Sequence, residues 1–202
     1  MTPTRSRLTD ADGATPLDED EIAGLIPASI QTRAELNAWE ATNIAEAVAW
    51  AYGRSHVNIL RTETLRELHR RMFGATWTWA GTFRRRDNNI SPHHWPQVPT
   101  LVSDLVEDTR AQHTNHELTN AGTDEIAVRF HHRLVRIHPW PNGNGRHARL
   151  ATELLLREWN RPAFTWGGAA QANVDEVRRG YLSALRAADA GRLEELLRFA
   201  RS

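Results

Sequence analysis

The stretch HPWPNGNGRHARL, residues 138–150, determines how the rest of the chain is interpreted. Two prolines and a glycine interrupt the helical periodicity at residues 138–143, and a helix is expected to begin near Gly145. Glycines let a backbone approach a ligand closely, and the N–H groups at the start of a helix attract anions. Arg146 and Arg149 are three positions apart, so they share a helix face, and guanidinium groups match phosphate oxygens. The stretch therefore predicts an anion-binding cradle for more than one phosphate.

A histidine stands at the edge of this cradle, because His138 directly precedes Pro139. A neutral imidazole in this place can accept a proton from an attacking hydroxyl group. A general base beside a polyphosphate cradle is typical of nucleotidyl or phosphoryl transfer. The simpler alternative is a helix with a glycine-containing entry loop and surface arginines, which a Gly-Asn-Gly sequence alone would favour.

The segments on both sides of this stretch have helical periodicity. Thr32 and Glu35 have the spacing of a capping box, and the helix that follows is expected to end at Gly53. Its inward residues are expected at helical spacing: Leu36, Trp39, Asn43, Ala47 and Trp50. Further helices are expected at about 62–73, 98–113, 123–136 with Thr123 as N-cap, 145–159, 173–189 and 192–200.

One segment has a different pattern. Residues 77–96, WTWAGTFRRRDNNISPHHWP, combine aromatic and β-branched residues with an Asp-Asn-Asn stretch and prolines. This composition favours a short β-hairpin over a helix. The fold class predicted from the whole pattern is all-α, a helical bundle with one short β-hairpin inserted.

Composition limits the other possibilities. The 202 residues contain 25 Lys and Arg against 25 Asp and Glu, so no bulk charge favours nucleic acid or membrane. The absence of cysteine excludes disulfides and thiolate metal sites. No signal peptide or membrane-spanning run is recognisable, and a cytoplasmic location is expected. Residues 1–25 are expected to form a flexible arm, and residues 26–202 one domain with its core at about 58–200.

The complete string resembles the signature of the Fic family, H-P-F-x-[D/E]-G-N-G-R-x-x-R, with Trp140 in place of Phe. The resemblance extends over about residues 30–200, and the chain as a whole resembles the branch called mobile mystery protein B. Members of that branch are bacterial and associated with mobile elements, beside a helix-turn-helix partner protein.

The resemblance implies an all-α fold and transfer of AMP from ATP to a Ser, Thr or Tyr hydroxyl group of a target protein. It implies that His138 is the general base and that Arg146 and Arg149 hold the β- and γ-phosphates. The backbone of Gly143, Asn144 and Gly145 would form the anion hole, with the Asn144 side chain on the α-phosphate. The hairpin at 82–91 would be the flap that aligns the target by β-augmentation.

The chain departs from the signature at Asn142, where the family has Asp or Glu as a ligand of Mg²⁺. An amide oxygen carries no charge, and Mg²⁺ prefers carboxylates together with phosphate oxygens. We therefore expect Asn142 to bind Mg²⁺ weakly, through its amide oxygen or a water molecule, and the activity to be lower than is typical of the family.

A second departure concerns inhibition. Many Fic proteins carry [S/T]-x-x-x-E-[G/N] on a helix, and its Glu pairs with the second arginine of the signature. Residues 42–46 fit this pattern, but Ala47 replaces Gly or Asn. Glu46 can therefore be an inhibitory residue that pairs with Arg149, or an ordinary solvated glutamate.

Two other classes of function remain open at this stage. A non-catalytic nucleotide-binding partner that regulates its neighbour on a mobile element needs only the cradle. A nucleic-acid-binding module would depend on Arg84–Arg86, a weak basic footprint in a chain of zero net charge. His131, His132 and His147 lack a carboxylate at zinc-ligand spacing, so a structural role is favoured. Tyr181 and Asn173 can approach an adenine, or Tyr181 can pack in the core.

Overall fold

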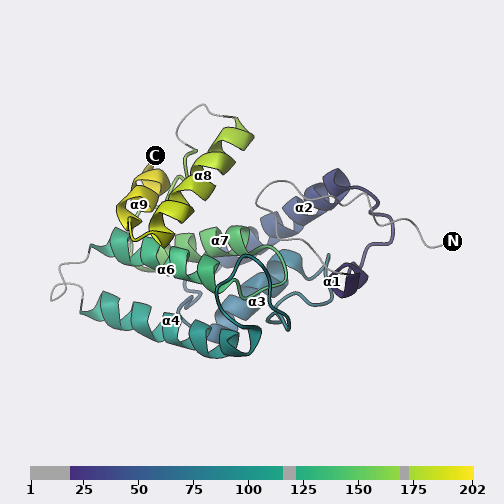
Figure 1. The fold of residues 1–202 in the computed structure, drawn as a ribbon, viewed down its shortest axis with the longest axis horizontal. Helices are drawn as coiled ribbons and strands as arrows, with labels where there is room; N and C mark the ends of the chain where they lie inside the picture. Colours follow the sequence, from purple (N-terminus) through teal and green to yellow (C-terminus); the bar gives the residue numbers. More distant parts are fainter. Residues whose placement is uncertain (1–18, 116–121, 169–172) are drawn as a thin grey trace.

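In a computed structural model of the protein, the described residues are 19–115, 122–168 and 173–202. They form helices that pack on one another without a β-sheet (Figure 1). In chain order the elements are α1 (Glu19–Ala23), α2 (Arg33–Tyr52), α3 (Thr62–Phe73), the short 3₁₀ helix η2 (Trp95–Gln97), α4 (Val98–Thr114), α6 (Thr123–Ile137), α7 (Asn144–Glu158), α8 (Val174–Asp189) and α9 (Leu193–Arg201). The expectation of a helical fold is confirmed, with helix ends within a few residues of those predicted. The first 18 residues of the expected arm lie outside the described residues.

The core has two parts, and α6 and α7 contribute to both. The larger part lies among α2, α3, α4, α6 and α7, and the smaller part lies where α8 and α9 cover α6 and α7. Figure 1 shows α8 and α9 as a pair at one end of the molecule and α2 at the other. The loop between α6 and α7, residues 138–143, is therefore enclosed by the rest of the fold, and all six of its residues are buried.

Local signals position the helices. Thr32 and Glu35 make the predicted capping box, since Thr32 Oγ1 accepts from Glu35 N at 3.2 Å and Glu35 Oε2 accepts from Thr32 N at 2.9 Å. Asn173 and Glu176 make a second one at α8. The prediction of Thr123 as an N-cap is off by one residue, because Gly122 is the N-cap and Thr123 begins α6.

The predicted inward face of α2 is partly wrong. The side of the helix that is buried contains Leu36, Glu40, Asn43, Ala47 and Ala51, whereas Trp39 is 44% exposed. The difference has a physical cause. The Glu40 carboxylate accepts from Trp77 and Arg146, which are distant in sequence, and these two hydrogen bonds make its burial tolerable.

The predicted β-hairpin is also wrong in its detail. Residues 78–94 are all described and contain no strand. Among the described residues, the only β-bridge near this segment is the isolated antiparallel pair of Leu25 and Trp77. Side chains satisfy this loop's backbone in place of a strand ladder. Asn88 Oδ1 accepts from the N–H groups of Ile90 and Ser91, and Asp87 Oδ1 accepts from Trp95 N.

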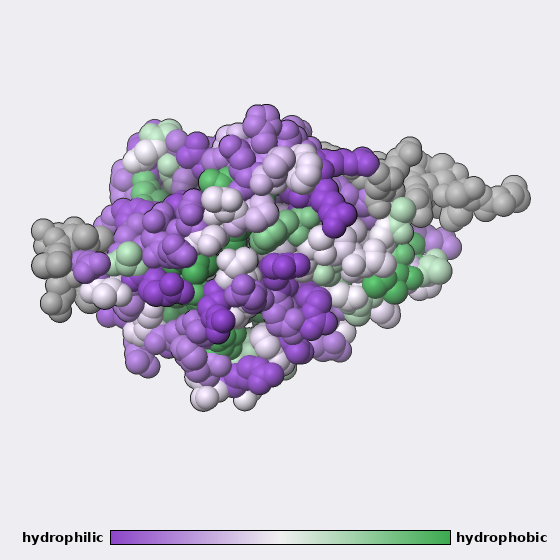
Figure 2. Space-filling model, turned by 90° about the horizontal axis from the view of Figure 1, so that it is seen from below, coloured by the Kyte–Doolittle hydropathy of each residue, from purple (hydrophilic) through white to green (hydrophobic). Residues whose placement is uncertain are grey.

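The surface shown in Figure 2 is mostly hydrophilic, with apolar residues in small areas. No helix in the described ranges is long and apolar enough to cross a membrane.

The three arginines at 84–86 do not form one basic surface patch, because Arg84 is only 3% exposed. This burial removes one of the three charges on which a nucleic-acid interface would depend.

Candidate active site

His138 is held at the C-terminal end of α6 in a strained backbone conformation. It is the C-cap residue, with φ 52° and ψ 58°, and its N–H donates to Leu134 O at 3.3 Å. The left-handed region is costly for a residue other than glycine, and such residues concentrate at functional sites. Here the backbone turn directs the ring into the fold, where the residue is 5% exposed.

The environment of the His138 ring defines its protonation state. Burial, the largest effect, lowers the pKa of His138 to about 4, so the ring is neutral at pH 7. Nδ1 lies 3.3 Å from Val135 O, a carbonyl that can only accept, so Nδ1 carries the proton. Nε2 is then the basic nitrogen, which is the tautomer that a general base needs.

The turn into α7 requires a glycine at position 143. Gly143 is the N-cap of α7 with φ 80°, and a Cβ atom there would lie 2.5 Å from Phe73 Cζ. Asn144, the first residue of α7, braces the same turn. Its Oδ1 accepts from Trp140 N at 3.0 Å and its Nδ2 donates to Trp140 O at 2.8 Å. Both ends of the Asn144 side chain are therefore engaged by Trp140, so its backbone N–H is the group at this residue that remains suited to an anion.

Buried aromatic rings pack against the loop at 138–143. The most important of them, His69, was not predicted from the sequence. His69 on α3 stacks on Trp140 with 4.3 Å between ring centroids. Its Nε2 lies 3.1 Å from Asn142 O, and its Nδ1 accepts from Gly81 N at 3.0 Å. One histidine thus connects α3, the base of loop 78–94 and the loop of residues 138–143, which is called the signature loop below. His69 comes four residues after the apolar Leu65, and this helical spacing, which places both on one face, was the available signal.

The two arginines of the signature have different partners. Arg146 pairs with Glu40 of α2, with 2.7 Å between NH1 and Oε2. Glu40 is 2% exposed, and its other oxygen accepts from Trp77 Nε1 at 2.8 Å. Arg149 lies over the ring of Tyr181, with Cζ 5.2 Å from its centroid. The cradle therefore presents one arginine paired with a buried carboxylate and one stacked on an aromatic ring.

The structure does not bring Glu46 to Arg149. Glu46 is exposed, and no ion pair joins the two among the residues described. Glu46 comes six positions after Glu40, so at about 100° per residue it lies roughly 120° away around the helix. The glutamate of α2 that reaches the signature is Glu40, and its partner is the first arginine instead of the second.

Asn142 does not present a metal ligand. The residue is 9% exposed, and its Oδ1 accepts from the N–H of Gly143 within the same loop. No group of three or more His, Cys, Asp or Glu side chains able to hold a metal occurs in residues 19–115, 122–168 and 173–202. The residues at this site therefore do not fit a magnesium ion held by the protein.

The other histidines considered from sequence are structural. His131 bonds to the Tyr181 hydroxyl at 2.9 Å, and burial lowers its pKa to about 3. His147 Nδ1 accepts from Trp140 Nε1 at 3.2 Å, and His132 pairs with Asp189 at 2.9 Å. Tyr181 packs in the smaller core, and Asn173 caps α8.

Comparison with known proteins agrees with this arrangement. The family model described as "Fic/DOC family" matches residues 59–156. This segment of the chain belongs to the Fic/DOC family. The segment extends from just before α3 to the last turn of α7, so it contains the loop at 138–143, His69 and loop 78–94.

Relatives in sequence are similar over part of their length. Protein adenylyltransferase Fic of Drosophila melanogaster is 33% identical over 97 residues, which are 48% of this chain and 20% of that protein. Protein adenylyltransferase fic-1 of Caenorhabditis elegans is 28% identical over 134 residues, 66% of this chain and 25% of the relative. The chain thus spans about a fifth to a quarter of the length of these relatives.

Solved Fic structures share the fold. The N-terminal Fic domain of a Bartonella effector protein from Bartonella sp. AR 15-3 has a TM-score of 0.68 and 14% identity, covering 99% of this chain and 91% of that one. A Fic domain from Bartonella quintana with bound ADP has a TM-score of 0.63 and 15% identity, covering 98% and 94% of the two chains. The helical bundle around the signature loop is therefore the Fic fold.

Proposed function

We propose that this protein is a protein adenylyltransferase, which transfers AMP from ATP to a Ser, Thr or Tyr hydroxyl group of a target protein. The observation that carries the proposal is the buried imidazole of His138, which lies six residues before the start of α7 and its two arginines. Membership of the Fic/DOC family and the activity in the names of its relatives support the same conclusion.

The proposed reaction is an in-line displacement at the α-phosphorus of ATP. The target hydroxyl oxygen attacks, its proton passes to Nε2 of His138, and the bond to the β-phosphate breaks, so pyrophosphate leaves. The backbone N–H groups of Asn144 and Gly145, in the first turn of α7, stabilise charge on the α-phosphate, while the N–H of Gly143 is held by Asn142 Oδ1. Arg146 and Arg149 hold the β- and γ-phosphates.

The resemblance to the mobile mystery protein B branch supports a bacterial, cytoplasmic setting. It also supports a neighbouring helix-turn-helix protein as a candidate partner.

The test uses ATP that is labelled on its α-phosphate. It measures how much of the label is transferred to the proteins of a bacterial lysate. We expect labelled protein with the α-label and none with a γ-label, because pyrophosphate leaves. His138→Asn should abolish the labelling, since Asn tolerates the left-handed backbone of this position and cannot act as a base. His56→Asn, at an exposed residue outside the cradle, should not change it. Equal labelling by His138→Asn and the unchanged protein would refute the proposal.

A second candidate function is supported by Asn142. A protein without the carboxylate at this position can bind a nucleotide as a regulatory partner without turning it over. Retained ATP binding by a protein that transfers no label would favour this candidate.

We further propose that the activity is self-inhibited through Glu40 instead of Glu46. Arg146 cannot hold a phosphate in full while it is paired with a buried carboxylate at 2.7 Å. Glu40→Gln keeps an acceptor for Trp77 and removes the charge, so we expect ATP affinity and labelling to rise several-fold. Glu46→Gln, on the exposed side of α2, should change neither. An equal response of both variants would contradict a specific role for Glu40.

A further inference from the structure

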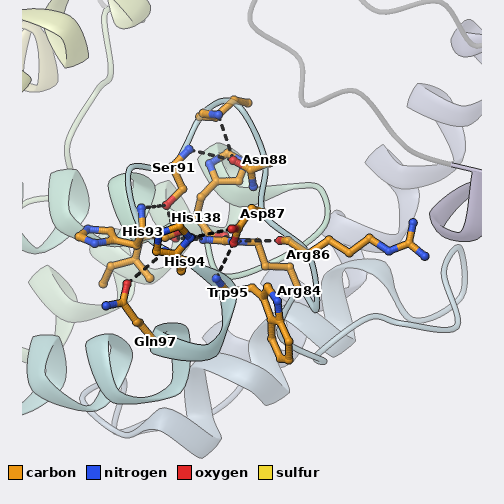
Figure 3. A network of polar contacts seen from close by, with 12 residues as sticks. Arg84, Arg86, Asp87, Asn88, Ser91, His93, His94, Trp95, Gln97 and His138 are labelled. Carbon is orange, nitrogen blue, oxygen red and sulfur yellow. Dashed lines mark hydrogen bonds and ion pairs between the residues drawn. The ribbon is translucent and has the colours of Figure 1, made fainter.

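Arg84 is a buried cation surrounded by backbone carbonyl groups. On the side of its own loop, NH1 donates to Arg86 O at 2.8 Å and NH2 to His93 O at 2.7 Å. On the side of α6, Nε donates to His138 O at 2.9 Å, and NH2 lies 3.5 Å from Ile137 O. Figure 3 shows Arg84 within the cluster formed by loop residues 86–94 and His138.

This position suits a guanidinium group for two physical reasons. The C-terminal end of α6 carries partial negative charge and carbonyl groups without a partner in the helix, which a cation stabilises. The planar fork of an arginine can also donate in several directions at once, whereas an ammonium group is a single point of charge. The backbone of Arg84 adds to the connection, because its N–H donates to Pro139 O at 2.8 Å. One residue therefore holds both sides of the junction between loop 84–94 and the signature loop.

We infer that Arg84 is a positioning residue, which fixes the backbone of His138 and couples it to loop 84–94. This inference rests on the proposed function, in which His138 is the base, and on the expectation from the Fic resemblance that the loop at 82–91 aligns the target segment. Because Arg84 joins His138 to loop 84–94, one side chain would align the target hydroxyl group with the base. The strained backbone of His138 makes such a support necessary, because a left-handed residue persists only where its surroundings hold it.

The charge of Arg84 also acts on the His138 ring. Burial is the main reason for the low pKa of His138, and the neighbouring Arg84 lowers that pKa further. Asp87 lies 3.5 Å from Arg84 NH1 and 2.7 Å from His94 Nδ1. His93, whose carbonyl accepts from Arg84, and Arg136, 4.0 Å from Asp189, are the further titratable or charged groups at this end of α6. Removal of the Arg84 charge should therefore raise the pKa of His138, whereas a lysine in its place, which keeps the charge, should not.

Three variants distinguish a role of Arg84 in positioning His138 from a role in supporting the fold alone. Arg84→Gln removes the charge and most donors, and Arg84→Lys keeps the charge but not the fork. Ser91→Ala is the matched control, because Ser91 Oγ donates to Arg136 O and Ile137 O, both at 3.0 Å. It removes a connection between the same loop and the same helix end without a contact to His138.

The measurements are an NMR titration of the His138 ring in nucleotide-free protein and the kinetics of AMP transfer. In Arg84→Gln we expect a higher pKa of His138 and a kcat about 100-fold lower at an unchanged KM for ATP, since a displacement of about 1 Å can cost that much. In Arg84→Lys we expect the pKa of His138 to stay low, the resonances of its ring to shift, and kcat to decrease. Ser91→Ala should leave the pKa and the ring resonances of His138 unchanged.

The outcomes distinguish this inference from the proposed function. A folded Arg84→Gln protein with an unchanged His138 titration would overturn the inference. If Arg84→Gln does not fold, Arg84→Lys decides, and unchanged His138 resonances there would overturn it. A wild-type protein that transfers no AMP, but whose His138 titration responds to Arg84→Gln, would refute the proposed function and leave the role of Arg84 standing.

Discussion

At the scale of single residues, Asn142 is the point where this chain departs from the Fic signature that it resembles. Its side chain is part of the loop, since Oδ1 accepts from the N–H of Gly143. An aspartate would keep that acceptor and add a negative charge with a second oxygen. The position thus accommodates a carboxylate without a change of the loop.

Asn142→Asp should therefore make AMP transfer faster and more dependent on Mg²⁺, because a carboxylate is the ligand that this ion prefers. The measurement is α-label incorporation across a range of Mg²⁺ concentrations. Asn37→Asp, on the exposed side of α2, adds the same charge elsewhere and serves as the control. An unchanged rate and an unchanged demand for Mg²⁺ would contradict the prediction.

At the scale of elements, α3 organises the site although it contributes no residue to the signature. Through His69 it holds Asn142 O of the signature loop and Gly81 N of loop 78–94. Through Phe73 it leaves room at position 143 for glycine alone. The orientation of the cradle therefore depends on a helix far from it in sequence.

His69→Leu should destabilise the fold by about 2 kcal/mol or more, because two buried backbone groups each lose a partner at roughly 1–3 kcal/mol. Urea unfolding measures the loss, and ATP binding should weaken as the loop loosens. The control is His56→Leu, whose side chain is 64% exposed. Equal stability of the two variants would show that His69 does not support the loop.

At the scale of the whole molecule, buried neutral histidines run through the core. The pKa of His131 is lowered to about 3, and those of His138 and His147 to about 4, in each case chiefly by burial. Burial also holds the pKa of His69 well below its usual value. These rings belong to α3, α6 and α7 and to the loop between the last two, so the whole centre of the fold depends on their remaining neutral.

Stability should therefore fall on acidification. The unfolded chain binds protons near pH 6.5, while the folded protein does not bind them until about pH 4. The stabilisation is complete above pH 6.5 and is lost as the pH falls toward 4, by roughly 1 kcal/mol per pH unit for each of these histidines. Thermal unfolding at several pH values measures this slope. His147→Gln should reduce it and His56→Gln should not; a melting temperature that is constant from pH 7 to 5 would contradict the prediction.

The sequence by itself determined the helices to within a few residues and the capping box of Thr32 and Glu35, whereas the predicted N-cap of α6 was off by one residue. Capping boxes, apolar spacing and the run from His138 to Arg149 act over a few residues, so their structural outcome is local. The inward face of α2 was predicted less well, because Trp39 and Glu40 are neighbours and apolar spacing favours the tryptophan.

Only the tertiary structure decided which partners the site residues have. Arg146 and Glu40 are 106 residues apart, His69 and Asn142 are 73 apart, and Arg84 and His138 are 54 apart. Whether such groups meet depends on how helices pack, and a rotation of about 100° per residue on α2 separates Glu40 from Glu46. Buried charged and polar groups are stable only where donors and acceptors converge, and that convergence is a property of the folded chain.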